Sequence, residues 1–249
     1  MTRRALIIAN PGTKGEPKYC EGVNKDVTNY TNYLQSAIGG LWQPAEIVPM
    51  FQPSVVSVQS EVRRLGAFDY STVIFVGHGW FSTSRDSTII ILKAGQEMDS
   101  LELRQGAKKR TIILDCCRMP HDEPLIVEHR MNALANFSAD LNPSDCRLYY
   151  DREIERCSEG VVVLYGCSIG EEGNDDSQRG GIYSYNLLRE ARNWAQNHNV
   201  DTTKSYGRHS VVVSHEAAKR AVESVPSRKQ HPQIEKPRTD PYFPFCIVA

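Results

Sequence analysis

The sequence of 249 residues has no long apolar run and no excess of charge of either sign. Its longest apolar runs, such as residues 161–165, are far shorter than the roughly 18 to 20 residues that a membrane-spanning helix needs. With 29 basic and 30 acidic residues, the formal net charge is −1, so no overall field favours nucleic acid or an anionic membrane as a partner. We therefore expect a soluble protein that binds neither.

Spacings typical of metal, disulfide and nucleotide sites are also missing. The seven cysteines include no C-x-x-C spacing and the seven histidines do not cluster, which argues against a zinc site and against a disulfide framework. No G-x-G-x-x-G follows the first apolar run and no P-loop occurs, so a nucleotide-binding domain ranks last among the interpretations. Arg3 and Arg4 lead straight into a strand-like run, so we expect no signal peptide and a reducing, cytoplasmic location.

Strand-like and helix-like segments alternate along the sequence, without internal repeats or a shift in composition. Val55, Val58, Val62 and Leu65, for example, recur at helical spacing. Such alternation predicts one α/β domain over residues 1–249, with a mostly parallel sheet of about six strands flanked by helices on both faces. The predicted strands are residues 5–9, 46–51, 72–78, 110–117, 161–167 and 242–248, with a hairpin at 88–96, and the predicted helices are residues 22–38, 54–65, 100–105, 183–197 and 210–224.

The pattern fails between residues 119 and 159, where prolines and scattered charges allow only a helix around residues 127–136. Loops longer than about 12 to 15 residues inside a compact domain are usually functional or disordered. We expect a mobile linker over residues 119–159.

Two of the apolar runs end in reactive side chains, His78 in one case and Cys116 and Cys117 in the other. Neighbouring strands of a parallel sheet present their carboxyl ends at one edge, so the imidazole and a thiol can meet there. A histidine raises the fraction of thiolate, the form that attacks a carbonyl. Gly77 and Gly79 favour a site, because they let a substrate approach the backbone. The competing interpretation is a structural histidine, the commoner role of a lone histidine after a strand.

Side chains alternate across a strand, so one of the two cysteines should be buried and the other should face the site.

The residues around His78 and Cys117 resemble the motifs of the caspase and metacaspase clan of cysteine peptidases. In that clan one strand ends in His-Gly, and a later strand ends in a cysteine that lies two positions after Asp or Gln and is followed by Arg, His or Gln. Residues 77–79 and 115–118 fit both elements, and the resemblance spans nearly the whole chain. Further similar stretches are residues 22–27 (GVNKDV), 180–184 (GGIYS), 230–233 (QHPQ) and 243–245 (FPF).

The resemblance implies a caspase-like fold and hydrolysis of a protein or peptide substrate through an acyl-enzyme, with no required cofactor. Cys117 would be the nucleophile, Cys116 its buried neighbour and His78 the proton donor to the leaving amine. The backbone N–H groups of Gly79 and Cys117 would form the oxyanion hole. One departure is Met119, followed by proline, where the family usually has glycine soon after the cysteine, so this turn must be built differently.

Specificity is expected to depend on Asp115, because in this clan the residue two positions before the nucleophile lines the primary pocket. A carboxylate there suits arginine, then lysine, and not aspartate. Ser168 and Glu171, the latter in an acidic run over residues 171–176, are the further candidates for substrate binding. The alternatives are that Asp115 caps a backbone turn and that the acidic run is a solvated loop.

Control of the activity is expected to come from an activating partner or a small-molecule signal, because no recruitment domain is attached. Metacaspases are often activated by calcium, and the acidic run offers oxygen ligands, although its spacing is not that of an EF-hand. An enzyme that prefers arginine could also cleave itself at Arg130, Arg147, Arg152 or Arg156. Similar prokaryotic proteins are often encoded with defence or cell-death partners, so the resemblance implies a role in antiviral immunity or cell death. The competing class is a non-catalytic caspase-like module that binds a signal or partner.

Overall fold

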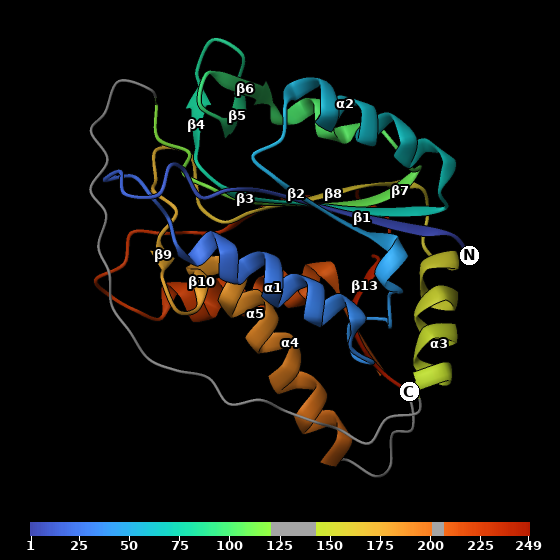
Figure 1. The fold of residues 1–249 in the computed structure, drawn as a ribbon. Helices are drawn as coiled ribbons and strands as arrows, with labels where there is room; N and C mark the ends of the chain where they lie inside the picture. The colour runs from blue at the N-terminus through green and yellow to red at the C-terminus, as the bar shows by residue number, and fades with distance from the viewer. Residues whose placement is uncertain (121–142, 201–206) are drawn as a thin grey trace.

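The computed structural model describes residues 1–120, 143–200 and 207–249. A central six-stranded sheet has helices packed against both of its faces (Figure 1). Its strands are β1 (Arg3–Asn10), β2 (Ile47–Phe51), β3 (Tyr70–Gly77), β7 (Lys109–Asp115), β8 (Gly160–Tyr165) and β12 (Gln233–Glu235). They lie in the order β12-β8-β7-β3-β1-β2, and all neighbours are parallel except the antiparallel pair of β12 and β8. The predicted fold class is confirmed.

Five α-helices and three short 3-10 helices are described. The helices are α1 (Gly22–Gln35), α2 (Val55–Arg64), α3 (Pro143–Glu155), α4 (Ile182–Val200) and α5 (Val211–Glu223), with 3-10 turns at Pro44–Glu46, Leu65–Ala67 and Ser100–Arg104. Serine side chains fix the starts of α2 and α5: the Ser54 hydroxyl accepts the Ser57 N–H at 3.1 Å, and the Ser210 hydroxyl accepts the Val213 N–H at 3.3 Å. None of the described helices is both long enough and apolar enough to cross a bilayer.

Residues of β1 alternate between two separate cores, one on each face of the sheet. Ala5, Ile7 and Ala9 pack with the layer that contains α1, α3, α4 and α5, whereas Leu6 and Ile8 pack against α2 and a small antiparallel sheet. Burial on both faces explains why the strand is a continuous apolar run.

The remaining strands form smaller sheets outside the central one. They are β4 (Gly79–Ser82), β5 (Ser87–Lys93) and β6 (Gln96–Asp99) in one antiparallel sheet, and the pairs β9 (Asp175–Asp176) with β10 (Gly180–Gly181) and β11 (Gly207–Ser210) with β13 (Pro244–Val248). The hairpin predicted over residues 88–96 is confirmed as β5 and β6. The predicted last strand exists as β13, but it pairs with β11 and not with the central sheet.

Helix α3 corrects the prediction that residues 119–159 lack regular structure. Its buried face includes Cys146, Tyr150 and Ile154, which recur every four residues, together with Glu153. The helix also exposes Leu148 and carries many charged side chains, so the periodicity is easily missed. The helix suggested at residues 127–136 lies outside the described residues.

Candidate active site

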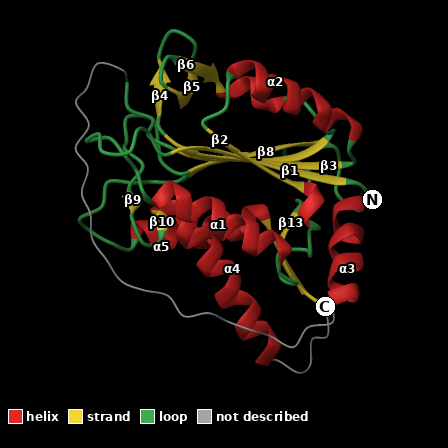
Figure 2. Cartoon of the chain, viewed as in Figure 1, coloured by secondary structure: helices red, strands yellow, loops and turns green. Residues whose placement is uncertain are grey.

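The carboxyl ends of β3 and β7 lie side by side, and Val76 and Asp115 form their last register pair. His78 and Cys117 each follow that pair by two residues. Figure 2 shows that many loops gather at this end of the sheet, opposite the N-terminus. Gly77 has a φ of +143°, and a Cβ there would lie 2.4 Å from the Asn10 carbonyl oxygen, so the turn into His78 requires glycine.

The His78 imidazole packs against the loop that follows β1. A Cβ on Gly12 would lie 3.2 Å from its Nε2, which is buried and has no hydrogen-bond partner among the described residues. Burial lowers the pKa of His78, whereas the nearby carbonyl groups of Lys18 and Pro11 raise it. Cys20 holds both carbonyls, through its N–H to Pro11 at 2.8 Å and its thiol to Lys18 at 3.8 Å. At neutral pH the imidazole is therefore mainly uncharged, which suits a general base.

The Cys117 sulfur is covered by the backbone of Gly173. The Gly173 N–H donates to the sulfur at 3.3 Å, and the thiol donates to the Gly173 carbonyl at 3.7 Å. Burial raises the pKa of Cys117 to about 11, although the contact with Gly173 opposes that increase. Within the described chain, no hydrogen bond joins Cys117 to His78. Burial therefore favours the uncharged imidazole and the protonated thiol, and the Gly173 backbone contacts the sulfur in this structure.

Cys116 is buried and Cys117 is half-buried, as the alternation of side chains predicts. A Cβ on Gly79 would lie 2.8 Å from the Cys116 sulfur, so this thiol packs under the start of β4. Burial raises the pKa of Cys116 above its usual range. The surroundings of Cys116 therefore suit a packing role.

The two predicted oxyanion donors lie on adjacent segments of backbone. Phe81 of β4 donates its N–H to the Met119 carbonyl at 2.9 Å and forms a parallel bridge with Pro120. Because N–H groups two residues apart in a strand point to the same side, the Gly79 N–H faces the segment that carries Cys117. The same contacts show how the turn with Met119 and Pro120 in place of the family's glycine is built: this segment runs extended beside β4.

Asp115 is buried, and its neighbours come from the start of α4, from β10 and from the residue that follows β8. Its Oδ2 accepts the Ser184 N–H at 2.9 Å, and a Cβ on Gly166 or Gly181 would lie within 2.4 Å of its carboxylate oxygens. Burial raises the pKa of Asp115 to about 6, and the hydrogen bonds from the Ser184 hydroxyl and N–H oppose that increase. Asp115 is therefore a buried carboxyl with no cationic partner among the described residues, in space that glycines leave open.

A second buried carboxyl, Asp26 of α1, lies beside Asp115. Its Oδ2 accepts the Gly181 N–H at 2.8 Å, while its Oδ1 is buried without a partner among the described residues. Burial, and then the charge of Asp115, raises the pKa of Asp26 well above its usual value. Sequence analysis included Asp26 in a stretch similar to the family but gave it no role, although an aspartate on the apolar face formed by Val23, Val27 and Tyr30 was a usable signal.

Ser168 and Glu171 have other contacts. The Ser168 hydroxyl donates to the His231 carbonyl at 2.9 Å, and the Glu171 carboxylate accepts the N–H groups of Ser168 and His231 and contacts the His231 ring at 2.5 Å. These contacts tie the loop after β8 to the segment before β12. The structure does not bring the two side chains together with Asp115, and their role in substrate binding stays a prediction.

The acidic run does not form a metal centre among the described residues, where no three His, Cys, Asp or Glu side chains are arranged to hold an ion. Its carboxylates have separate N–H donors: Glu171 binds His231, Asp175 accepts the Gly22 N–H at 3.1 Å, and Asp176 caps the turn before Arg179. Calcium activation stays an untested expectation.

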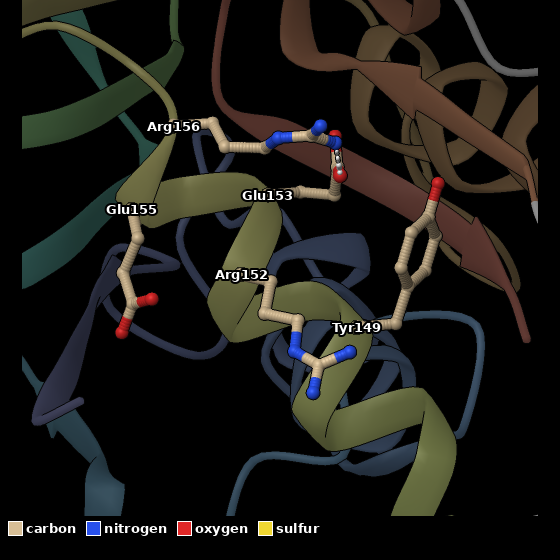
Figure 3. Close-up of a pocket in the computed structure, with 5 residues that line it drawn as sticks. All are labelled: Tyr149, Arg152, Glu153, Glu155 and Arg156. Carbon is tan, nitrogen blue, oxygen red and sulfur yellow. Dashed lines mark hydrogen bonds and ion pairs between the residues drawn. The ribbon is translucent and has the colours of Figure 1, made fainter.

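A surface hollow of about 720 Å³ lies along α3, lined by Tyr149, Arg152, Glu153, Glu155 and Arg156 (Figure 3). Lys109, the first residue of β7, donates to carbonyls at the end of α3, so the hollow lies at the opposite end of the strands from Asp115. It contains none of the predicted site residues.

Two of the proposed self-cleavage residues, Arg147 and Arg152, lie within α3, where a helical backbone does not suit cleavage. Arg130 lies outside the described residues.

Comparisons with known proteins bear on the family and the fold of the chain. A family model described as Caspase domain matches residues 2–243. A similar solved structure is the crystal structure of caspase-1 from Spodoptera frugiperda, with a TM-score of 0.57 and 11% sequence identity over 94% of this chain and 86% of that one. No curated protein matches the sequence significantly.

Proposed function

The chain belongs to the caspase-domain family, and from that premise we propose that it is a cysteine endopeptidase with Cys117 as nucleophile and His78 as base. The observation that carries the proposal is the common position of the two residues, each two places beyond the register pair of Val76 and Asp115. Sheet register thus sets an imidazole and a thiol at one edge, where a peptide can reach both.

The proposed chemistry begins when substrate displaces Gly173 from the sulfur. His78 takes the thiol proton as the sulfur attacks the scissile carbonyl, and the imidazolium returns that proton to the leaving amine. The N–H groups of Gly79 and Cys117 stabilise the oxyanion, a contribution of about 2.7 to 4 kcal/mol per donor in serine peptidases. Water then hydrolyses the thioester, with His78 again as base.

We propose that the enzyme cleaves after arginine in preference to lysine. Asp115 and Asp26 are buried carboxyls with no cationic partner among their described contacts. Burial raises the pKa of both, and a positive charge nearby would stabilise their ionised forms. A guanidinium offers five N–H donors in a planar fork and can satisfy both carboxylates, whereas an ammonium offers three. A cation between the two carboxylates would also offset the cost of burial that raises both pKa values.

The second candidate is a binding module that does not cleave. The covered Cys117 sulfur and its pKa of about 11 favour this alternative. The presence of both His78 and the Cys117 thiol argues against a module that only binds.

A panel of fluorogenic peptides with Arg, Lys, Leu or Asp before the reporter tests the proposal. Release from the Arg peptide by wild type and Cys116→Ala, but not by Cys117→Ala, supports a peptidase of basic specificity. Equal cleavage of Arg and Asp peptides contradicts the specificity, and silence on every peptide with and without calcium favours the binding module. On the family resemblance alone, the proposed setting is cytoplasmic antiviral defence or cell death. This is tested by comparing the survival of hosts that carry the wild-type protein with that of hosts that carry Cys117→Ala.

A further inference from the structure

Asn10, the last residue of β1, is a buried polar side chain beside the proposed base His78. It is 3% exposed, and it forms a register pair with Gly77, the residue that precedes His78. A buried amide needs hydrogen-bond partners, because an unsatisfied donor or acceptor is costly. The partners of Asn10 lie on the two segments that hold His78.

The first of these segments is the loop after β1, against which the imidazole packs. Asn10 Oδ1 accepts the Gly12 N–H at 3.0 Å, and a Cβ on Gly12 would lie 3.2 Å from His78 Nε2. A bond from an N–H group to the asparagine oxygen two residues earlier is an Asx turn, which folds the chain back on itself. The Asn10 side chain thus sets the course of the loop beside the ring.

The second segment is β5. Asn10 Nδ2 donates to the Ile91 carbonyl at 2.7 Å, and the Ile91 N–H donates to the His78 carbonyl at 2.9 Å. One residue of β5 therefore links the Asn10 amide to the backbone of His78. The same amide fixes both that backbone and the wall against which the ring packs.

Gln52, the residue after β2, supports the Asn10 amide. Its Nε2 donates to Asn10 Oδ1 at 3.2 Å and to the Gly12 carbonyl at 3.0 Å, and its backbone N–H donates to the Ala9 carbonyl at 2.8 Å. Gln52 has a φ of +43°, which is uncommon for a residue other than glycine and persists where surrounding contacts determine it. With the Gly12 N–H, Gln52 gives Asn10 Oδ1 two donors, so the amide is held in one orientation.

We propose that Asn10 is a positioning residue for His78, which holds the imidazole where it exchanges a proton with the Cys117 thiol. The inference rests on the proposed peptidase function and adds to it a residue that acts through Gly12 and Ile91. A base must lie within hydrogen-bond reach of the proton that it takes, and a misplacement of about 1 Å can slow a reaction about a hundredfold.

A double-mutant cycle tests the proposal, with the rate at which a peptidyl-arginine chloromethyl ketone alkylates Cys117 as the readout. Asn10→Ala is expected to slow alkylation about tenfold to a hundredfold when His78 is present. In His78→Ala protein the same change should alter the rate by less than about twofold, because a residue that acts through His78 then has nothing to position. An equal slowing in the presence and absence of His78 overturns the proposal.

Asn186→Ala is the matched control, because Asn186 is 4% exposed and its Nδ2 donates to the Ile182 carbonyl within α4 at 2.7 Å. This change removes an equally buried amide, so equal slowing by Asn186→Ala and Asn10→Ala also overturns the proposal. If Asn10→Ala does not fold, Asn10→Ser takes its place, since its hydroxyl can accept the Gly12 N–H in a weaker turn of the same kind. The same pattern is then expected at smaller size.

A second measurement decides the matter even if no peptide is cleaved. Diethyl pyrocarbonate modifies imidazoles, and His78 Nε2 is buried, so a loosened loop should expose it to the reagent. Modification is followed by peptide mass spectrometry in Cys117→Ala protein with and without Asn10→Ala, and the half-exposed His231 is the internal reference. Several-fold faster modification of His78 at an unchanged rate for His231 supports the positioning role. An unchanged rate at His78, or equal acceleration at both histidines, overturns it, whereas a protein that neither cleaves peptides nor reacts with the ketone contradicts only the proposed function.

Discussion

His78 and Cys117 occupy equivalent positions beyond one register pair of neighbouring strands, Val76 of β3 and Asp115 of β7. Their common position is fixed by backbone pairing within the buried sheet and not by a flexible loop. A shift of β7 by one residue would exchange the places of Cys116 and Cys117, so the register also selects which thiol reaches the site.

Replacement of Gly173 by alanine is expected to loosen the contact of this loop with the Cys117 sulfur. A Cβ at this position would lie 3.1 Å from the Cys116 carbonyl carbon and 3.3 Å from the Cys117 nitrogen, so the loop and its neighbour must separate by a few tenths of an ångström. We expect iodoacetamide to label Cys117 several-fold faster, measured by peptide mass spectrometry over time. Gly66→Ala, which adds a Cβ into open space, is the control, and equal labelling rates in the two variants would show that the loop does not protect the sulfur.

Labelling of Cys117 in the wild-type protein is expected to increase steeply with pH. With the pKa raised to about 11, the thiolate fraction at pH 7 is on the order of one in ten thousand and grows about tenfold per pH unit. Rates measured from pH 6 to pH 10 should keep rising. A plateau below pH 8 would mean that the thiol is already activated in the resting protein.

Replacement of Asp115 by asparagine is expected to stabilise the protein at pH 8. Burial raises the pKa of this acid from 3.8 to about 6, so the folded state binds the proton more tightly than the unfolded state. Ionised Asp115 therefore costs on the order of 3 kcal/mol above pH 6, and the cost is relieved as pH falls from 6 to below 4. Thermal unfolding should show Asp115→Asn several degrees more stable at pH 8, with the gap shrinking towards pH 4. A gap that is constant or widens on acidification would argue against a buried ionised carboxyl.

Removal of the His231 side chain is expected to loosen the loop that carries Gly173. The His231 ring contacts Glu171 at 2.5 Å, two residues before Gly173. The pair is half exposed on the His231 side, so its loss should cost less than about 1 kcal/mol of global stability. We expect His231→Ala to speed iodoacetamide labelling of Cys117 with little change in melting temperature, and to add little when combined with Gly173→Ala. Unchanged labelling would show that the contact of His231 with Glu171 does not hold the Gly173 loop over the Cys117 sulfur.

The central elements of the fold were predictable because burial on both faces makes β1, β3, β7 and β8 continuous apolar runs that end in recognisable residues. Helix α3 was missed because its buried face includes a charged residue, Glu153, while an apolar residue, Leu148, is exposed. Position along the strands predicted that His78 and the two cysteines lie at one edge, whereas the choice of Cys117 and the pocket role of Asp115 came from the family resemblance and stay predictions. Contacts made across more than a hundred residues, such as Ser184 with Tyr30, leave no local pattern in the sequence. The contact of Glu171 with His231, which are 60 residues apart, likewise leaves no local pattern.

The most direct test of the account is peptide mapping after exposure to a peptidyl-arginine chloromethyl ketone, which an active-site thiol displaces to form a stable thioether. We predict a single adduct on Cys117, strongly reduced in His78→Ala and in Asp115→Asn and unaffected in Cys116→Ala. An adduct on Cys116 or Cys20, or equal labelling of Cys117 in His78→Ala, would contradict the proposed Cys117 and His78 pair.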